Sequence, residues 1–422
     1  MNPVSRREFL GSSAKNAAGV AAGMVGLGAV PFRPASDRVR LGVIGVRNRG
    51  KQLACGFAAM PDVEVAALCD VDASQLPAAT RAVEEAQGRP PRWEHDFRRL
   101  LDDRALDALV IATPDHWHAA MMVRACEAGK DVYVEKPVSR TIAEGEKMVA
   151  AAERHQRVVQ CGIQERSGGQ FRSAIEFVRS GRLGDVRLAR AWAVQRRKPI
   201  GAKKDGLAPE CVDYDLWLGP APQRAFNPNR FHYNWRWYWD YGTGELGNWG
   251  THMLDVARWG LGVEWPRRVS SSGGVYHLRD DRQTPDTQTV HFDFGDRTLV
   301  WEHRQWTSHG IEGRSTAAAF YGEHGTLIVD RGGWKVYDCR ESITHAADDC
   351  EAAHLRNFID CIRTRGTPHA DIRTGHVSSA LCHLGNMAHR LDREIAVDPH
   401  TGAVDDANAI LLEGEPRSPW TV

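Results

Sequence analysis

The chain has 422 residues, more than one hydrophobic core normally serves, so we expect two domains. Its 54 Lys and Arg residues balance 54 Asp and Glu residues, and the formal net charge is +0. A balanced chain has no global field that would hold nucleic acid or an anionic membrane surface. We therefore expect a small molecule as the substrate and no nucleic-acid partner.

The first residues are typical of a targeting signal. Residues 5–10 read Ser-Arg-Arg-Glu-Phe-Leu, a twin-arginine export pattern, and an Ala/Gly-rich run covers residues 17–30. That run is shorter than the roughly 18 residues that span a bilayer, so no stable membrane insertion is expected. We predict a signal and linker over residues 1–36, the twin-arginine machinery as a partner, and a periplasmic or otherwise exported location. A basic disordered tail or a short membrane anchor is the alternative. No clean cleavage site stands between Gly28 and Asp37, so cleavage stays open.

The nine cysteines are odd in number and scattered, which is unlike a disulfide framework. They form no CxxC pair, and a histidine pair with the spacing of His116 and His118 is seldom a metal site without a carboxylate or a third ligand nearby. We expect no metal site.

The next part of the chain alternates short apolar runs with amphipathic helical patterns, as stacked βαβ units do. We predict a Rossmann domain over residues 37–160 with a doubly wound parallel sheet. Its helix after Pro137 opens with a capping box, Thr141 to Glu144. The expected strands are residues 39–44, 63–69, 108–112, 131–134 and 158–161.

After Cys161 the pattern becomes α+β, and we predict a substrate and oligomerisation domain over residues 161–395, followed by a tail over 396–422. A loop is expected over 219–230. The expected strands are 186–194, 287–294, 298–306 and 326–329, and the expected helices are 170–180, 251–260, 352–363 and 376–391, of which the last three should pack on the second sheet.

The first strand runs into the turn Gly45-Val46-Arg47-Asn48-Arg49-Gly50, where a glycine-rich turn can set a pyrophosphate on a helix N-terminus. Arg47 replaces the middle glycine, so an ordinary βα turn is the alternative. Asp70 follows the second strand, where a carboxylate accepts hydrogen bonds from ribose hydroxyls and repels a 2′-phosphate. The pattern favours NAD over NADP, although Arg47 and Arg49 could soften the preference.

The next two strands end at Thr113-Pro114-Asp115 and Glu135-Lys136-Pro137. Ligands of open α/β sheets bind outside these strand ends, and the proline holds Lys136 extended. A solvated strand-end lysine is the alternative. The predicted cofactor contacts are Gly45, Arg47, Asn48, Arg49, Gly50, Asp70, Thr113, Pro114, His116, His118, Glu135 and Lys136.

These motifs, with Ala128-Gly129-Lys130 and the segment from Gly242 to His252, resemble the glucose-fructose oxidoreductase / inositol dehydrogenase / rhizopine catabolism (Gfo/Idh/MocA) family. The resemblance implies a Rossmann domain followed by a large, mainly antiparallel, open-faced sheet, with sugars or polyols oxidised or reduced at the junction. It also implies that Lys136 touches the reacting hydroxyl. Because an open sheet face needs covering, we expect a homo-oligomer.

Hydride leaves a carbinol carbon only if the hydroxyl proton is also taken, and His252 is the candidate base. The family commonly carries a carboxylate four residues earlier, where this chain has Asn248. An amide can hold the ring or bind the sugar, but it cannot stabilise an imidazolium by charge. Either His252 works with Lys136 alone or another carboxylate substitutes, and Asp255 is the nearest spare. A buried structural histidine is the alternative.

The aromatic segment 231–241 precedes the His252 motif and predicts a sugar platform, because aromatic faces stack on sugar rings. Strand packing is the alternative. The predicted substrate contacts are Gln164, Arg166, Tyr233, Arg236, Trp237, Asn248 and His252.

Three functions remain open. The first is an exported NAD-dependent oxidoreductase acting on a ring hydroxyl of a sugar or glycoside, with a tightly held cofactor and with Lys136, His252 and Asn248 as catalytic residues. The second is a glycosidase that oxidises, eliminates, hydrates and reduces, with Tyr233, Tyr238 or His232 as a second acid/base. The third is a non-catalytic NAD-binding protein, suggested by Asn248 and Arg47.

Overall fold

The computed structural model describes residues 38–338, 344–412 and 414–420. The predicted twin-arginine signal and linker lie outside these residues. No helix within these residues is long and apolar enough to cross a membrane.

In the part of the chain that the structure describes, the first sheet has six parallel strands in the order β3-β2-β1-β4-β5-β6. The order reverses beside β1, so the carboxyl ends of β1 and β4 flank the crevice where such sheets bind ligands. The sequence missed β3, whose three residues carry no buried alternation. The strands are β1 (Val39–Ile44), β2 (Val63–Cys69), β3 (Arg92–Glu94), β4 (Ala108–Ile111), β5 (Asp131–Val134) and β6 (Val159–Cys161).

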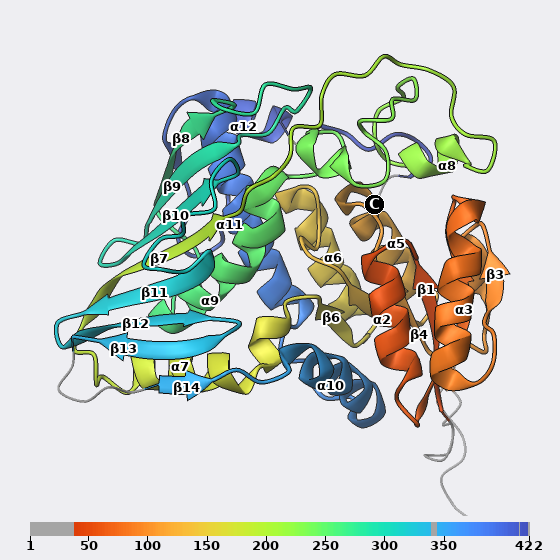
Figure 1. Ribbon diagram of the computed structural model, residues 1–422, viewed down its shortest axis with the longest axis horizontal. Coiled ribbons are helices and arrows are strands. Elements are labelled where there is room, and N and C mark those ends of the chain that lie inside the picture. Colours follow the sequence, from red (N-terminus) through yellow and green to blue (C-terminus); the bar gives the residue numbers. More distant parts are fainter. Residues whose placement is uncertain (1–37, 339–343, 413, 421–422) are drawn as a thin grey trace, which may run out of the picture. The chain divides into compact units, whose positions relative to one another are not determined.

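Helices cover both faces of this sheet (Figure 1). They are α2 (Arg49–Ala58), α3 (Leu76–Gln87), α4 (Arg98–Asp102), α5 (Asp115–Glu127) and α6 (Ile142–Arg154). Helix α6 begins at the predicted capping box: the Glu144 N–H donates to Thr141 Oγ1 at 3.1 Å, and Glu144 accepts the Thr141 N–H at 3.2 Å. This box satisfies backbone donors that the first turn leaves without partners.

Among the described residues, the second sheet has nine strands in the order β14-β13-β12-β11-β7-β10-β9-β8-β15. Every pair is antiparallel except β7 with β10. Its strands are β7 (Val186–Val194), β8 (Arg268–Gly274), β9 (Thr287–Asp293), β10 (Thr298–Arg304), β11 (Thr316–Gly322), β12 (Gly325–Asp330), β13 (Gly333–Tyr337), β14 (Thr344–Ala346) and β15 (Ile395–Ala396). The fold is thus the predicted Rossmann unit plus an α+β part with a large, mainly antiparallel sheet.

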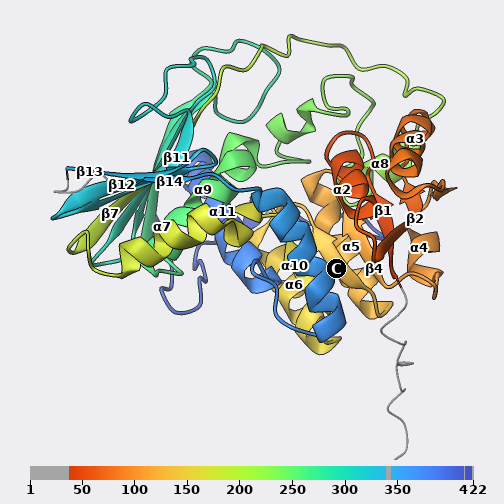
Figure 2. The same ribbon diagram turned by 60° about the horizontal axis from the view of Figure 1, so that its bottom comes forward.

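Helices α7 (Gly169–Arg179), α9 (Thr251–Leu261) and α11 (Ile372–Leu391) pack on one face of this second sheet (Figure 2). The same apolar core contains Phe171, Leu254 and Leu384 together with Trp301 of β10. A short helix, α12 (Ala407–Leu411), contacts α11.

One prediction about the C-terminal part was wrong. Helix α10 (Cys350–Thr364) packs on the Rossmann core instead of the second sheet, with Phe358 against Phe57 and Tyr133. The segment predicted as a tail is also packed: Trp420 is 5% exposed and contacts Phe97 and Trp117 of the Rossmann part. Amphipathic patterns show that a helix has a buried face but not which core it joins.

A long excursion, residues 195–241, leaves β7 and crosses to the Rossmann part before the chain returns to α9 (Figure 1). It contains α8 (Tyr214–Leu218) and a 3₁₀ turn, η3 (Asn234–Trp237). Val212 pairs with Asp72 as an isolated antiparallel bridge, and the Asp213 N–H donates to the Val71 carbonyl at 2.9 Å. We call residues 195–241 the strap.

Candidate active site

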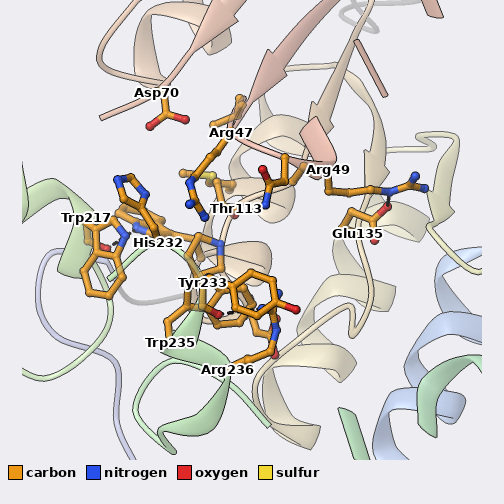
Figure 3. A pocket seen from close by; sticks show the side chains of 18 of the residues that line it. Arg47, Arg49, Asp70, Thr113, Glu135, Trp217, His232, Tyr233, Trp235 and Arg236 are labelled. Carbon is orange, nitrogen blue, oxygen red and sulfur yellow. Dashed lines mark hydrogen bonds and ion pairs between the residues drawn. The ribbon is translucent and has the colours of Figure 1, made fainter. Parts of the chain in front are cut away.

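A cavity of about 410 Å³ lies at the carboxyl ends of the first sheet and continues under the strap (Figure 3). Side chains from the Rossmann strand ends, the strap and helix α9 meet there. The predicted residues that line it are Gly45, Arg47, Asn48, Arg49, Asp70, Thr113, Pro114, Glu135, Lys136, Gln164, Tyr233, Arg236, Asn248 and His252.

The turn after β1 requires glycine at both ends. Gly45 has φ +80, and a Cβ there would lie 2.8 Å from the Ala112 carbonyl oxygen. A Cβ on Gly50 would lie 1.7 Å from the Gly45 carbonyl oxygen, so the start of α2 touches the turn. Gly50 therefore acts through close packing instead of lining the cavity, as the third glycine of this fingerprint does.

Asp70 closes the far end of the cavity. Its carboxylate accepts the N–H groups of Val46 at 2.8 Å and Asp72 at 3.0 Å. Burial raises the pKa of Asp70 to about 6, against those two hydrogen bonds. Arg47 extends from the turn into the space between Asp70 and the strap (Figure 3).

The cavity has features that fit a dinucleotide. No side chain of residues 38–338, 344–412 and 414–420 caps the N-terminus of α2, so the first N–H groups of this helix remain for an anion. Among the described residues, Thr113 Oγ1 and Gln164 Oε1 are buried at the cavity without a hydrogen-bond partner. The turn after β1 and helix α2 would hold the pyrophosphate of a bound dinucleotide, and Asp70 would hold its adenosine ribose.

Arg49 does not reach freely into the cavity. Its Nε donates to Glu135 Oε1 at 2.7 Å, and its Nη2 lies 2.8 Å from Glu351 Oε1. Glu351 comes from α10, a partner that sequence reasoning missed. The ion pairs raise the pKa of Arg49 in spite of burial. Arg49 thereby ties Glu135 in place beside Lys136.

Lys136 points at Asn248. Its Nζ donates to the Asn248 carbonyl oxygen at 2.9 Å and to Asn248 Oδ1 at 2.8 Å. Burial lowers the pKa of Lys136, and the charge of Glu135 opposes that shift. The amide at 248 therefore holds the lysine, not the histidine ring.

His252 has a carboxylate partner that the sequence did not reveal. Its Nδ1 lies 2.8 Å from Glu165 Oε2, and Glu165 is fully buried. Arg331 donates to Glu165 Oε1 from Nε at 3.0 Å and from Nη2 at 2.7 Å. The suggested spare, Asp255, instead accepts from Arg166 at 2.7 and 2.9 Å and from Ser378 at 2.6 Å.

Four further predicted contacts lie outside the cavity lining. Arg166 is turned away by Asp255, and Trp237 is 2% exposed within the core of the strap. His116 Nε2 lies 3.0 Å from the Trp217 carbonyl oxygen. His118 lies between the carbonyl oxygens of Pro137 and Thr113, at 2.7 and 2.9 Å. Both histidines are buried and contact backbone carbonyl oxygens in the walls of the site.

The strap contributes an aromatic wall. The Arg236 guanidinium lies 4.0 Å from the Tyr233 ring centroid and 4.8 Å from that of Trp235, and Tyr233 is 41% exposed. Asp115 also lines the cavity and accepts a hydrogen bond from Thr243 Oγ1 at 3.1 Å. Burial raises the pKa of Asp115 to about 7, against the charges of Lys136 and Arg236.

Family models match both parts of the chain. Residues 39–163 match the NAD-binding Rossmann fold of an oxidoreductase family, and residues 200–422 match the C-terminal alpha/beta domain of the same family. The chain belongs to the Gfo/Idh/MocA oxidoreductase family. Its first domain is accordingly an NAD-binding Rossmann domain.

Curated relatives are similar over part of their length. A glycosyl hydrolase family 109 protein of Saccharopolyspora erythraea is 38% identical over 177 residues, 37% of this chain and 38% of the relative. One from Shewanella pealeana is 31% identical over 203 residues, 43% of this chain and 44% of the relative. The chain therefore matches less than half the length of these relatives.

Solved structures share the fold. The WlbA dehydrogenase of Bordetella pertussis, in complex with NADH and UDP-GlcNAcA, has a TM-score of 0.63 at 20% identity, with 86% of this chain and 99% of that chain covered. Levoglucosan dehydrogenase, in complex with NADH and levoglucosan, has a TM-score of 0.67 at 18% identity, with 85% and 99% covered. The aldose-aldose oxidoreductase of Caulobacter crescentus, complexed with glycerol, has a TM-score of 0.66 at 20% identity, with 85% and 100% covered.

Proposed function

We propose that the protein is an NAD-dependent oxidoreductase that transfers hydride between its nicotinamide cofactor and a ring carbon that carries a hydroxyl in a sugar or glycoside. The observation that carries this proposal is the meeting of Lys136 and the His252–Glu165 pair in the same cavity as the glycine turn. A proton acceptor and a hydrogen-bond donor are what alcohol oxidation needs beside a hydride acceptor.

The bound nicotinamide supplies the hydride acceptor in oxidation and the hydride donor in reduction. His252 Nε2, the ring nitrogen that Glu165 leaves available, takes the hydroxyl proton. Lys136 Nζ donates to the substrate oxygen, and Asn248 holds that ammonium in place. Tyr233 and Trp235 offer ring faces to the sugar.

Two measurements test the proposal. The purified protein is denatured and the supernatant analysed for released dinucleotide. Intact protein is then mixed with a panel of sugars, oligosaccharides and their 3-keto derivatives while the absorbance of the bound cofactor is followed. We expect released NAD and an absorbance change with some members of the panel. No released dinucleotide and no binding of added NAD would overturn the proposal.

The adenosine end favours NAD over NADP. The Asp70 carboxylate lies there, and Asp72 follows it in the same wall of the cavity. A 2′-phosphate placed beside these carboxylates would be repelled, at a cost of several kcal/mol. We expect Asp70→Ala to reduce the preference for NAD over NADP by about tenfold or more. Dissociation constants of both dinucleotides, measured by titration, check this, and an unchanged ratio would contradict it.

The strap supports a tightly held cofactor. His232 Nε2 lies 2.8 Å from Asp72 Oδ2, and the Trp217 carbonyl accepts from Trp117 Nε1 at 3.0 Å. These contacts fasten the strap over the adenosine end, where Trp217 lines the cavity.

We expect His232→Ala to raise the dissociation rate of NAD about tenfold, because hydrogen bonds to charged groups are worth roughly 1.5 to 3 kcal/mol. The rate is measured by mixing holoprotein with an enzyme that destroys free NAD. Arg393→Ala, which removes an exposed ion pair to Asp406 outside the cavity, is the control. Equal rates in both variants would show that the strap does not retain NAD.

The proposal also includes export through the twin-arginine pathway and assembly as a homo-oligomer. Residues 5–10 motivate export, and the nine-stranded sheet with helices on one face motivates assembly. Cell fractionation of the wild type and of Arg6→Lys/Arg7→Lys tests the first. Light scattering of the purified protein tests the second.

A glycosidase that uses NAD transiently is the second candidate, and the names of the similar curated proteins favour it. Of the residues proposed as its second acid/base, Tyr233 and His232 line the cavity, whereas Tyr238 is buried outside it. Aryl glycosides separate the candidates: free phenol without net NADH indicates hydrolysis, and accumulated keto-sugar indicates oxidation.

A further inference from the structure

Glu165 is a carboxylate without access to water. It lies in η2 (Gln164–Ser167), the turn after β6, and its side chain has 0% exposure. Burial of a carboxylate is costly unless it is paired and hydrogen-bonded. Its two oxygens are divided between two partners: Oε2 faces His252 Nδ1, and Oε1 accepts two N–H groups of Arg331.

The two partners differ in accessibility. Both line the cavity, but His252 is 5% exposed and the Arg331 side chain is 42% exposed. The Arg331 guanidinium lies 5.0 Å from the Trp249 ring centroid, and that ring lies 5.5 Å from the His252 ring. Arg331 and Trp249 thus close over the buried pair.

We propose that Glu165 is the positioning residue of His252, that it fixes the proton on Nδ1 and leaves Nε2 as the proton acceptor, and that Arg331 moderates the basicity of this pair. The role of this positioning in catalysis rests on the proposed function. The carboxylate for His252 thereby comes from the turn after β6 instead of position 248, where Asn248 serves Lys136.

The charged groups that face His252 set the direction of each expected effect. Burial lowers the pKa of His252, and so do the positive charges of Lys136 and Arg331, whereas Glu165 raises it. The charge of the Glu135 carboxylate also interacts with His252. Removing the negative charge of Glu165 should therefore lower the pKa of His252, and removing the positive charge of Arg331 should raise it.

The matched variants are Glu165→Gln and Arg331→Gln. Glutamine at 165 can still accept a hydrogen bond from Nδ1, so the first variant removes the charge while it keeps the contact. Asp255→Asn is the control, because Asp255 is also buried but bonds Arg166 and Ser378. Thermal melting of the holoprotein shows whether each variant folds. If Glu165→Gln fails to fold, Arg331→Gln remains as a test, because the Arg331 side chain is half-exposed.

The closing experiment follows the histidine itself. Full-length holoprotein with ¹³C/¹⁵N-labelled histidine is titrated by NMR, and the His252 signal is identified by its loss in His252→Gln. We expect an Nδ1–H tautomer in the wild type, a pKa lower by about one to three pH units in Glu165→Gln, and a higher pKa in Arg331→Gln. An Nε2–H tautomer, or a His252 pKa that moves in neither variant, would overturn the proposal.

The pH profile of hydride transfer then connects this pair to the reaction. In the oxidation direction the base works when neutral. The ascending limb of the pH profile should therefore move to lower pH in Glu165→Gln and to higher pH in Arg331→Gln, and it should stay in place in Asp255→Asn. Shifted NMR titrations with no hydride transfer to any sugar would support the positioning role and count against the proposed function alone. Shifted titrations with an unmoved limb would show that His252 is not the base.

Discussion

Lys136→Met is expected to lower the rate of hydride transfer by roughly two to four orders of magnitude while NAD stays bound. The Lys136 ammonium is held by two acceptors of Asn248 at the cavity wall, so it is oriented before a substrate arrives. Methionine keeps the length of the side chain and removes the donor. The measurement is the single-turnover absorbance change of bound cofactor, with the most active sugar of the panel.

The control for this variant is Lys335→Met, which changes a lysine of β13 outside the cavity. It should leave both the rate and the bound NAD unchanged. Because burial disfavours the charged form of Lys136, the methionine variant should be no less stable to heat than the wild type. An unchanged rate in Lys136→Met would show that Lys136 does not take part in the reaction and would place the reacting groups elsewhere in the molecule.

The Rossmann half could be predicted from the sequence because its signals are local. The capping box of α6, the buried strands and the carboxylate after β2 all occur within short stretches of chain. Strand β3 was missed because two of its three residues are exposed. Arg47 departs from the glycine-rich motif and weakened the sequence signal for a cofactor site. The turn that Gly45 and Gly50 form is nevertheless present in the structure.

The His252 partner could not be predicted for the opposite reason. Glu165 lies 87 positions from His252, and no spacing rule links a turn after β6 to helix α9. Sequence reasoning named both neighbours of Glu165 and placed them at the cavity, but only Gln164 lines it. Asp255 and Glu165 were both possible carboxylate partners of His252. Arg166 donates to Asp255, and His252 contacts Glu165.

That division has a consequence for the family motif. A carboxylate four residues before the histidine would lie where Asn248 now holds Lys136. A carboxylate at position 248 would form an ion pair with the Lys136 ammonium and favour its charged form. The Asn248 amide binds the ammonium and adds no charge of its own. The chain therefore separates two tasks: a neutral group orients the lysine, and a buried carboxylate orients the histidine. The departure at 248 is thus compatible with catalysis and gives little support to a non-catalytic protein.

Gly50→Ala is expected to abolish retention of NAD through purification and to weaken its binding by at least about a hundredfold. The added Cβ would lie 1.7 Å from the Gly45 carbonyl oxygen, a backbone atom that has no side-chain freedom to move away. Helix α2 would have to separate from the turn, and the pyrophosphate site depends on that contact. Dinucleotide content after denaturation and a titration with NAD give the result.

Gly56→Ala in the same helix is the matched control. Both substitutions replace a helical glycine by alanine, which favours the helix by roughly 0.8 to 1.0 kcal/mol. At position 56 the added Cβ meets only Leu355 Cδ1, at 2.6 Å, and the end of a leucine side chain can rotate. Position 56 should therefore retain NAD. If Gly50→Ala retained it equally well, the turn after β1 would not be the cofactor site, and the cavity would need another ligand.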